Sequence, residues 1–159
     1  MTVALLLVNG TFWFVYQVGL SNVRVFSMVM AMMEHRSYVI GAFYHRSNVG
    51  ELITGSVAGD VKIWDLRMPK SVRTIDAQAS KDHTTTALAV HSRAPIFASG
   101  SKNGAIKVFN FDGTALSHIR YHEGFLGQRI GPVASMAFHP HKVVLGTGST
   151  DGIVSIFSG

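Results

Sequence analysis

The chain has 159 residues, of which 47% are hydrophobic and 14% charged, and 14 Lys and Arg against 9 Asp and Glu give a formal charge of +5. This composition is that of a globular protein and excludes an intrinsically disordered chain. The absence of cysteine excludes disulfides, thiol catalysis and cysteine-ligated zinc, and the scattered basic residues argue against a nucleic-acid-binding face.

The N-terminal segment is apolar, and residues 1–23 carry no charged side chain, so its length alone would allow a membrane span. No basic flank of a secretory signal accompanies it. Asn9-Gly10 between two apolar runs is a strong hairpin signal. We therefore expect strands of a sheet here and set residues 1–21 apart as an atypical apolar segment. A membrane-tethered protein and a replaced native N-terminal region are the competing interpretations.

One sequence motif occurs three times: a glycine, alternating apolar residues, an aromatic residue and a small polar residue. It stands at 59–65, 104–110 and 152–158. Gly-Ser pairs precede it at Gly55, Gly100 and Gly148, with steps of 45 residues (55 to 100) and 48 residues (100 to 148). Around each Gly-Ser pair, an apolar run is followed by a tight turn with glycine and then by the alternating run of the motif. This order predicts a hairpin of two strands.

Further strand candidates flank these hairpins. They stand upstream at 38–43, 86–90 and 133–138, and downstream at 71–75 and 115–119. Four antiparallel strands in a unit of about 45 residues are the signature of a β-propeller. The fold class predicted is therefore all-β, a partial β-propeller with about three four-stranded antiparallel blades. Residues 22–27 indicate the tail of a degraded fourth blade.

The repeat also predicts the domain organisation. We assign residues 22–159 to the partial propeller, with blades at approximately 35–76, 83–120 and 131–159. The last blade lacks a fourth strand, and the apolar stretch 2–8 is the candidate to supply it. An open array of three blades would expose apolar faces, and we expect it to aggregate or dimerise.

The units resemble WD repeats, in which an opening histidine, a strand Ser or Thr, a turn Asp and a strand Trp form a buried hydrogen-bonded set. The first unit offers His35, Thr54 and Trp64, with Asp65 closing the strand, but Ala58 at the turn position leaves the set incomplete. The other two units carry phenylalanine in place of tryptophan. Their candidates for the set are Ser99, Asn103, Thr147 and Asp151.

A narrower resemblance rests on residues 86–91, 95–101, 106–110 and, most specifically, 119–141. These stretches are similar to the C-terminal WD-repeat propeller of the Raptor family, in particular its plant and algal members. Members of that family are scaffold subunits of target of rapamycin complex 1. The family's caspase-like domain and helical solenoid are not part of this sequence.

The resemblance implies a protein–protein interaction scaffold that acts in nutrient and growth signalling. It implies other proteins of the target of rapamycin kinase complex and its regulators as partners. It also implies a cytoplasmic location, with recruitment to the lysosomal or vacuolar surface through those partners. Two other interpretations stay open: a generic WD-repeat adaptor, such as a ubiquitin-ligase substrate receptor, or a truncated gene model without independent function.

The insertion at 120–132 is the candidate partner-binding loop. Tyr121, Phe125, Leu126 and Arg129 are of the residue types that anchor interfaces, and loops on a rigid scaffold often carry function. The alternative is that Phe125 and Leu126 pack between blades.

Other candidate sites are weak. His139 and His141 would point to one face of a strand as a metal pair, but no further ligand lies near them in the sequence. The glycine-rich turns lack the strand-to-helix context of phosphate loops, and no nucleophile elbow is present. We therefore expect no catalytic, cofactor or metal site, no nucleic-acid partner and no integral membrane protein.

Overall fold

The computed structural model describes residues 3–8, 11–16, 30–45, 50–77, 84–119 and 131–159. Within these ranges every regular element is a β-strand, as the sequence predicted. The described residues hold no helix long and apolar enough to cross a membrane.

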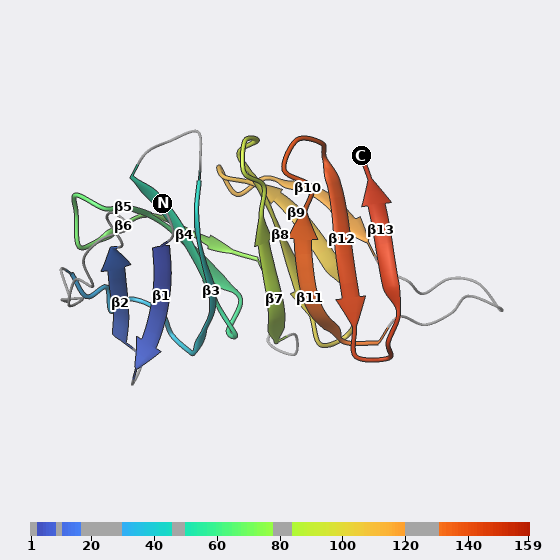
Figure 1. Cartoon of the computed structure of the whole chain (residues 1–159), viewed down its shortest axis with the longest axis horizontal. Coiled ribbons are helices and arrows are strands. Elements are labelled where there is room, and N and C mark those ends of the chain that lie inside the picture. Colours follow the sequence, from blue (N-terminus) through green and yellow to red (C-terminus); the bar gives the residue numbers. More distant parts are fainter. Residues whose placement is uncertain (1–2, 9–10, 17–29, 46–49, 78–83, 120–130) are drawn as a thin grey trace, which may run out of the picture.

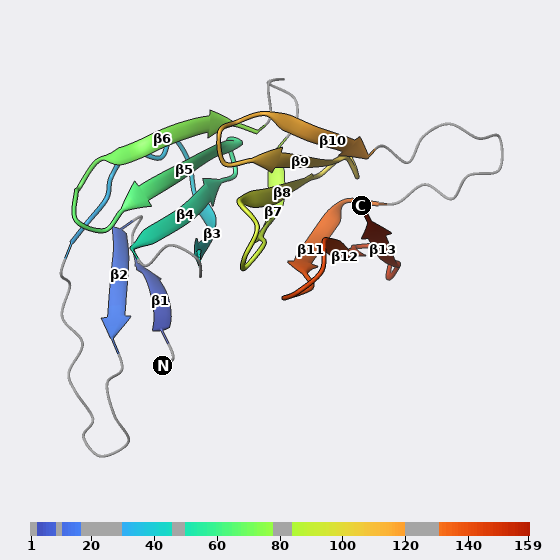
Figure 2. The ribbon, with the colours of Figure 1, turned by 90° about the horizontal axis from the view of Figure 1, so that it is seen from above.

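Three antiparallel sheets repeat one plan and follow one another side by side (Figures 1 and 2). Blade 1 is formed by β3 (Val39–Tyr44), β4 (Glu51–Ser56), β5 (Asp60–Asp65) and β6 (Ser71–Asp76). Blade 2 is formed by β7 (Thr85–Val90), β8 (Ile96–Ser101), β9 (Ile106–Asn110) and β10 (Ala115–Ile119). Blade 3 is formed by β11 (Val133–Phe138), β12 (Val144–Ser149) and β13 (Val154–Ser158). The predicted all-β partial propeller is confirmed.

The N-terminal hairpin has its own two-stranded sheet. β1 (Val3–Val8) pairs with β2 (Thr11–Tyr16), and Val8 lies opposite Thr11, as the Asn9-Gly10 signal predicted. The prediction that residues 2–8 complete the last blade is wrong, because β1 pairs with β2 and lies at the other end of the molecule from β13 (Figure 1). Pairing across a two-residue loop closes at far lower entropic cost than pairing with the distant β13. The predicted tail of a degraded fourth blade, 22–27, lies outside the described residues.

The glycine of each Gly-Ser pair occupies the same place on the second strand of its blade. A Cβ added to Gly55 would lie 2.9 Å from Cδ2 of Leu88, and one added to Gly100 would lie 2.6 Å from Cγ1 of Val133. Leu88 and Val133 belong to the first strand of the following blade. The repeated glycine therefore makes room for an apolar side chain that the next blade inserts.

Buried apolar side chains fill the space between neighbouring blades. Between blades 1 and 2 the cluster includes Ile53, Leu88 and Phe97. Between blades 2 and 3 it includes Ala98, Ile106, Val133 and Leu145. The blades are thus held together by the hydrophobic effect, because alternate residues of each sheet face the next sheet.

Replacing Gly100 with alanine should push Val133 away and lower the free energy of unfolding by about 1–3 kcal/mol, as overpacked cores do. Gly146→Ala is the matched control, because a Cβ there would meet only the backbone oxygen of Ala137, at 3.8 Å. Urea denaturation of both variants measures the difference. Equal unfolding midpoints would show that the close approach of the two blades at Gly100 is not required.

Candidate functional site

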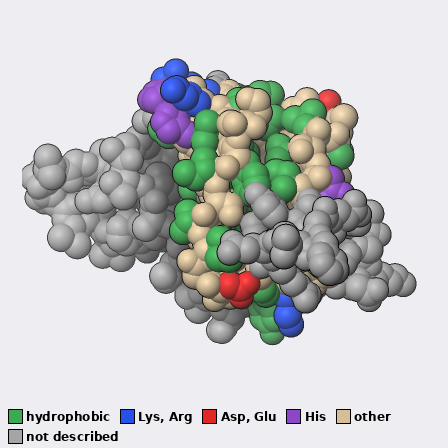
Figure 3. Space-filling view, turned by 90° about the vertical axis from the view of Figure 1, so that its right-hand side faces the viewer, with side chains coloured by type: hydrophobic (Ala, Val, Ile, Leu, Met, Phe, Trp, Pro, Cys, Tyr) green, Lys and Arg blue, Asp and Glu red, His purple; other side chains and the backbone are tan. Residues whose placement is uncertain are grey.

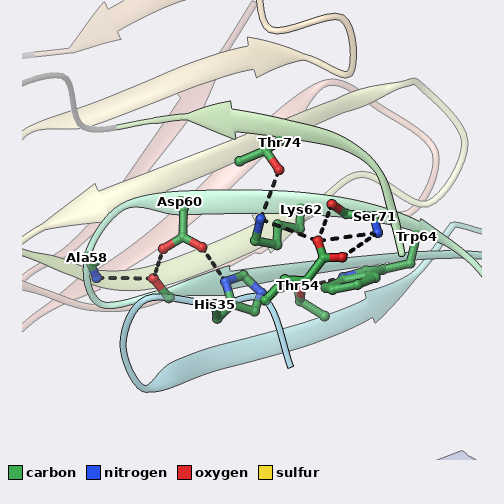
Figure 4. Close-up of polar contacts among 10 residues, drawn as sticks. His35, Thr54, Ala58, Asp60, Lys62, Trp64, Ser71 and Thr74 are labelled. Carbon is green, nitrogen blue, oxygen red and sulfur yellow. Dashed lines mark hydrogen bonds and ion pairs between the residues drawn. The ribbon is translucent and has the colours of Figure 1, made fainter. Parts of the chain in front are cut away.

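A continuous chain of hydrogen bonds runs through blade 1 (Figure 4). Trp64 Nε1 donates to Thr54 Oγ1 at 2.7 Å, and the Thr54 hydroxyl lies 2.6 Å from Nε2 of His35. Nδ1 of His35 lies 2.5 Å from Oδ2 of Asp60, and the Ser56 hydroxyl donates to the other carboxylate oxygen. With the proton of His35 on Nδ1, every donor in this chain has an acceptor.

The prediction that the first unit has an incomplete set is wrong. Ala58, at the expected turn position, contributes only its backbone N–H, which donates to Ser56 Oγ at 3.2 Å. The carboxylate comes from Asp60 instead, which opens β5 directly after Gly59, a glycine with φ of 93°. The alternation of side chains along a strand could have indicated Asp60 from the sequence. Asp60 stands four residues before Trp64 and therefore lies on the same face of the strand.

Burial sets the charge state of this network. The side chain of His35 is 5% exposed and that of Asp60 is 9% exposed. Burial lowers the pKa of His35, although Asp60 opposes this, so the ring is neutral near pH 7. Burial alone would raise the pKa of Asp60, but the hydrogen bonds from Ser56 and His35 outweigh it and hold that pKa below its usual value.

Acid should therefore destabilise the protein. The pKa of His35 is lower in the folded state than in the unfolded state, so unfolding takes up a proton at acid pH. The contribution of His35 to the free energy of unfolding is therefore complete above the unfolded pKa of about 6.5, and it is lost as the pH falls below that value. Asp60 adds a loss of the same sign below its unfolded value of about 3.9. We expect the urea midpoint to decrease as the pH is lowered from 7.5 to 5.5, and to decrease less in His35→Gln than in the wild type. An unchanged pH dependence in His35→Gln would contradict this assignment.

A second polar cluster joins the segment before β3 to the outer strands of blade 1. The buried Lys62 ammonium donates to Thr74 Oγ1 at 2.9 Å and lies 3.7 Å from the Glu34 carboxylate. Glu34 in turn accepts a hydrogen bond from the Ser71 hydroxyl at 2.5 Å. Figure 4 shows this cluster beside the His35 network. Residues 34 and 35 thereby bind the sheet at two points.

Asp65 is not part of the buried set. Its carboxylate accepts hydrogen bonds from the backbone N–H of Arg67, at 3.0 Å, and from its guanidinium, at 2.6 Å. These bonds lower the pKa of Asp65 to about 2. Asp65 therefore stabilises the turn after β5 and holds a surface ion pair, a contact that contributes little to stability.

The candidates in blades 2 and 3 form no such chain among the described residues. Ser99 Oγ is buried without a hydrogen-bond partner, and Phe109, in the position of Trp64, stacks on Phe97 at 5.3 Å between centroids. Thr147 makes only a long contact, 3.4 Å, to the Ser155 carbonyl. The carboxylate of Asp151 lies against Gly131, and the side chain of Phe109 has no N–H that could donate as the indole of Trp64 does.

A histidine follows the first strand of every blade, at His45, His91 and His139. Nδ1 of His91 accepts the backbone N–H of Arg93 and Ala94, at 3.1 and 2.8 Å, and His139 accepts those of His141 and Lys142, both at 3.1 Å. His139 thus caps a turn. In the described part of the chain no cluster of three potential metal ligands occurs. The sequence carries a signal for this role, because the three histidines recur at nearly the period of the glycines.

The side chains proposed for the candidate partner-binding loop, Tyr121, Phe125, Leu126 and Arg129, lie outside the described residues. The role of this loop stays a prediction.

Comparison with known proteins gives three consistent results. The WD domain, G-beta repeat family matches residues 69–110 and 124–158, and both matches end on the third strand of a blade. The chain is 41% identical to the protein raptor homolog of Dictyostelium discoideum, over 84% of this chain and 9% of that protein. It is 40% identical to the regulatory-associated protein of TOR 1 of Arabidopsis thaliana, over 82% of this chain and 10% of that protein.

A solved structure is similar as well. The crystal structure of Chaetomium thermophilum Raptor matches with a TM-score of 0.75 and 30% identity, covering 94% of this chain and 14% of that one. The chain spans about a tenth of the length of the curated relatives that it matches.

Proposed function

This chain belongs to the Raptor family as a segment of its WD-repeat propeller, and on that premise we propose that it acts as a protein-interaction scaffold in a target of rapamycin complex 1. The observation that carries the proposal is the identity to Raptor homologues over more than four fifths of the chain. Blades of packed strands suit this role, because they hold their connecting turns in fixed positions for partners to bind.

The proposed partners are the kinase of that complex, its other subunits and their regulators, and the proposed role is in nutrient and growth signalling. The contact surface would include Tyr121, Phe125, Leu126 and Arg129, since aromatic residues and arginine dominate interface energies. Residues 22–159 would form the propeller part, and residues 1–21 would stand apart from it. The site of action would be the cytoplasm, with recruitment to the lysosomal or vacuolar surface through partners. The role is one of binding and not of catalysis.

A segment exchange tests this function. The matching segment of the Dictyostelium discoideum raptor homolog is replaced by residues 30–159 of this chain, and recovery of the target of rapamycin kinase with the tagged protein is measured. We expect recovery comparable with that of the unmodified homolog, because the two segments are 41% identical over most of this chain. The same exchange carrying Phe125→Ala, Leu126→Ala and Arg129→Ala should recover less kinase or regulator. A chimera that accumulates normally but recovers no kinase would refute the proposal.

A further inference from the structure

The turn after the first strand of blade 2 lies against the corresponding turn of blade 3. These turns, residues 91–95 and 139–143, join β7 to β8 and β11 to β12. The Ser92 hydroxyl in the first turn donates to the Pro140 carbonyl in the second at 2.9 Å. Figure 1 shows the two turns side by side at the upper edge of the sheets. We call the surface that they form together the seam.

A histidine holds each turn of the seam in place. Nδ1 of His91 accepts two backbone N–H groups of its own turn, so the proton of the neutral ring lies on Nε2, which is 3.3 Å from the Lys142 carbonyl. His139 accepts two backbone N–H groups through Nδ1 in the same way, so its Nε2–H is a donor at the surface. This geometry disfavours the metal pair of His139 and His141, because a ring nitrogen that carries a proton does not bind a metal.

The seam exposes cationic side chains and contains no carboxylate of its own. Arg93 in the turn of blade 2 is exposed, and so are His139, His141 and Lys142 in the turn of blade 3. Neither turn contains Asp or Glu. Figure 3 shows Lys or Arg side chains and His side chains gathered at one corner of this end of the molecule. Cationic groups that lie together without an anion attract anionic partners.

The exposure of the seam does not depend on a missing neighbour. Arg93 stands third in its turn, counted from the histidine, and His141 stands third in the next turn. Arg93 remains exposed although blade 3 packs against blade 2. The position of His141 would therefore remain exposed beside a following blade too.

The excess positive charge of the described residues lies in blades 2 and 3. Residues 30–45 and 50–77 carry five Lys and Arg against five Asp and Glu, whereas residues 84–119 and 131–159 carry four against two. In blade 1 and the segment before it, carboxylates pair with Lys and Arg of the same unit. The turns of the seam have no carboxylate for such pairs, so an anionic partner would compensate their charge.

We propose that the seam binds an acidic segment of a partner protein, whose carboxylates pair with Arg93, Lys142 and the Nε2–H of His139. Each exposed ion pair contributes little, so a ligand needs several of them. A polypeptide with several carboxylates reaches both turns at once and meets this need. Nucleic acid is a poorer fit, because the basic residues form no dense run with aromatic residues between them. The inference concerns the charge of these two blades and stands whether or not the protein joins a target of rapamycin complex.

Fluorescence anisotropy of a labelled peptide tests this proposal with the full chain. The probe is a short peptide that alternates glutamate and serine, and its control carries glutamine in place of each glutamate. We expect the acidic peptide to bind at least about fivefold more tightly than the glutamine peptide, because only carboxylates form the ion pairs. Its affinity should fall when the salt concentration is raised to about 0.3 M, since salt screens exposed charges.

Variants locate the binding surface. Arg93→Gln combined with Lys142→Gln should weaken binding of the acidic peptide by about fivefold, as the loss of two exposed ion pairs does. Lys70→Gln combined with Lys102→Gln is the matched control, because it removes two exposed cations outside the seam, and it should change the affinity by less than about twofold. Arg93→Glu combined with Lys142→Glu should bind a lysine version of the peptide in preference to the acidic one. All these side chains are exposed, so the urea midpoints of the variants should match that of the wild type.

Three outcomes would overturn the proposal. The first is equal affinity of the acidic peptide for the wild type and for Arg93→Gln with Lys142→Gln. The second is an equal loss of affinity in the matched control, because attraction would then follow the net charge and not the seam. The third comes from phosphatidylcholine vesicles that contain phosphatidylserine. If these vesicles bound through Arg93 and Lys142 and the peptide did not bind, the seam would recognise a lipid surface and not a protein.

Discussion

Replacing Trp64 with alanine is expected to lower the free energy of unfolding by about 3–5 kcal/mol, as truncation of a buried large aromatic residue does. Trp64 is fully buried and packs with Met32 and Leu52, so its loss leaves a cavity that a sheet cannot close. The indole N–H also donates to Thr54, which links the packing to the polar network. Urea denaturation followed by circular dichroism measures the change.

Trp64→Phe is the matched variant, since Phe109 occupies the same register position in blade 2. It keeps most of the ring volume but removes the donor, and a lost hydrogen bond of this kind costs about 1–2 kcal/mol. Thr54 still bonds to His35 in this variant. The two variants should therefore differ clearly in urea midpoint. If alanine and phenylalanine destabilised equally, the packing of Trp64 would not be the dominant contribution.

Replacing Asp60 with alanine is the second large effect that we expect. Nδ1 of His35 and the hydroxyl of Ser56 both lose their acceptor in a buried site. Each unsatisfied buried donor costs about 1–3 kcal/mol, so the loss of both acceptor contacts should lower the free energy of unfolding by about 2–6 kcal/mol. The loss should be greatest at pH 7.5, where the Asp60 carboxylate is ionised and the His35 ring neutral.

Two further variants separate this effect from a general loss of charge. Asp65→Ala removes a carboxylate that contacts only the turn and Arg67, and we expect its urea midpoint to stay close to that of the wild type. Asp60→Asn keeps the shape and one acceptor oxygen, so it should lie between the wild type and Asp60→Ala. A midpoint for Asp60→Ala equal to that of Asp65→Ala would show that the His35 network does not stabilise blade 1.

The blades were predictable from the sequence because their strands are short and separated by glycine turns. The glycines at 55, 100 and 148 set the period, and the alternation after each of them gave the third strand. Three members of the polar network, His35, Thr54 and Trp64, followed from the resemblance to WD repeats. These features depend on local sequence, which one chain displays directly.

Other features depend on distant contacts that no local pattern reports. Asp60 replaces Ala58 as the partner of His35 because the strand turns its side chain toward a ring 25 residues earlier. The pairing of β1 with β2, and not with β13, is decided by competition between a close and a distant strand. Val61 and Val154 occupy equivalent strand positions, yet Val61 is buried and Val154 is exposed, because burial depends on what packs against the strand and not on the local pattern.

The most direct test of the proposed function is affinity isolation of the native protein that contains these residues, tagged at its own locus, followed by quantitative mass spectrometry. We predict that the target of rapamycin kinase is among the most enriched proteins, and that Trp64→Ala, which disrupts blade 1, lowers its recovery. Enrichment of a ubiquitin ligase or another assembly, with no kinase recovered, would contradict the assignment of this WD-repeat segment to a target of rapamycin complex.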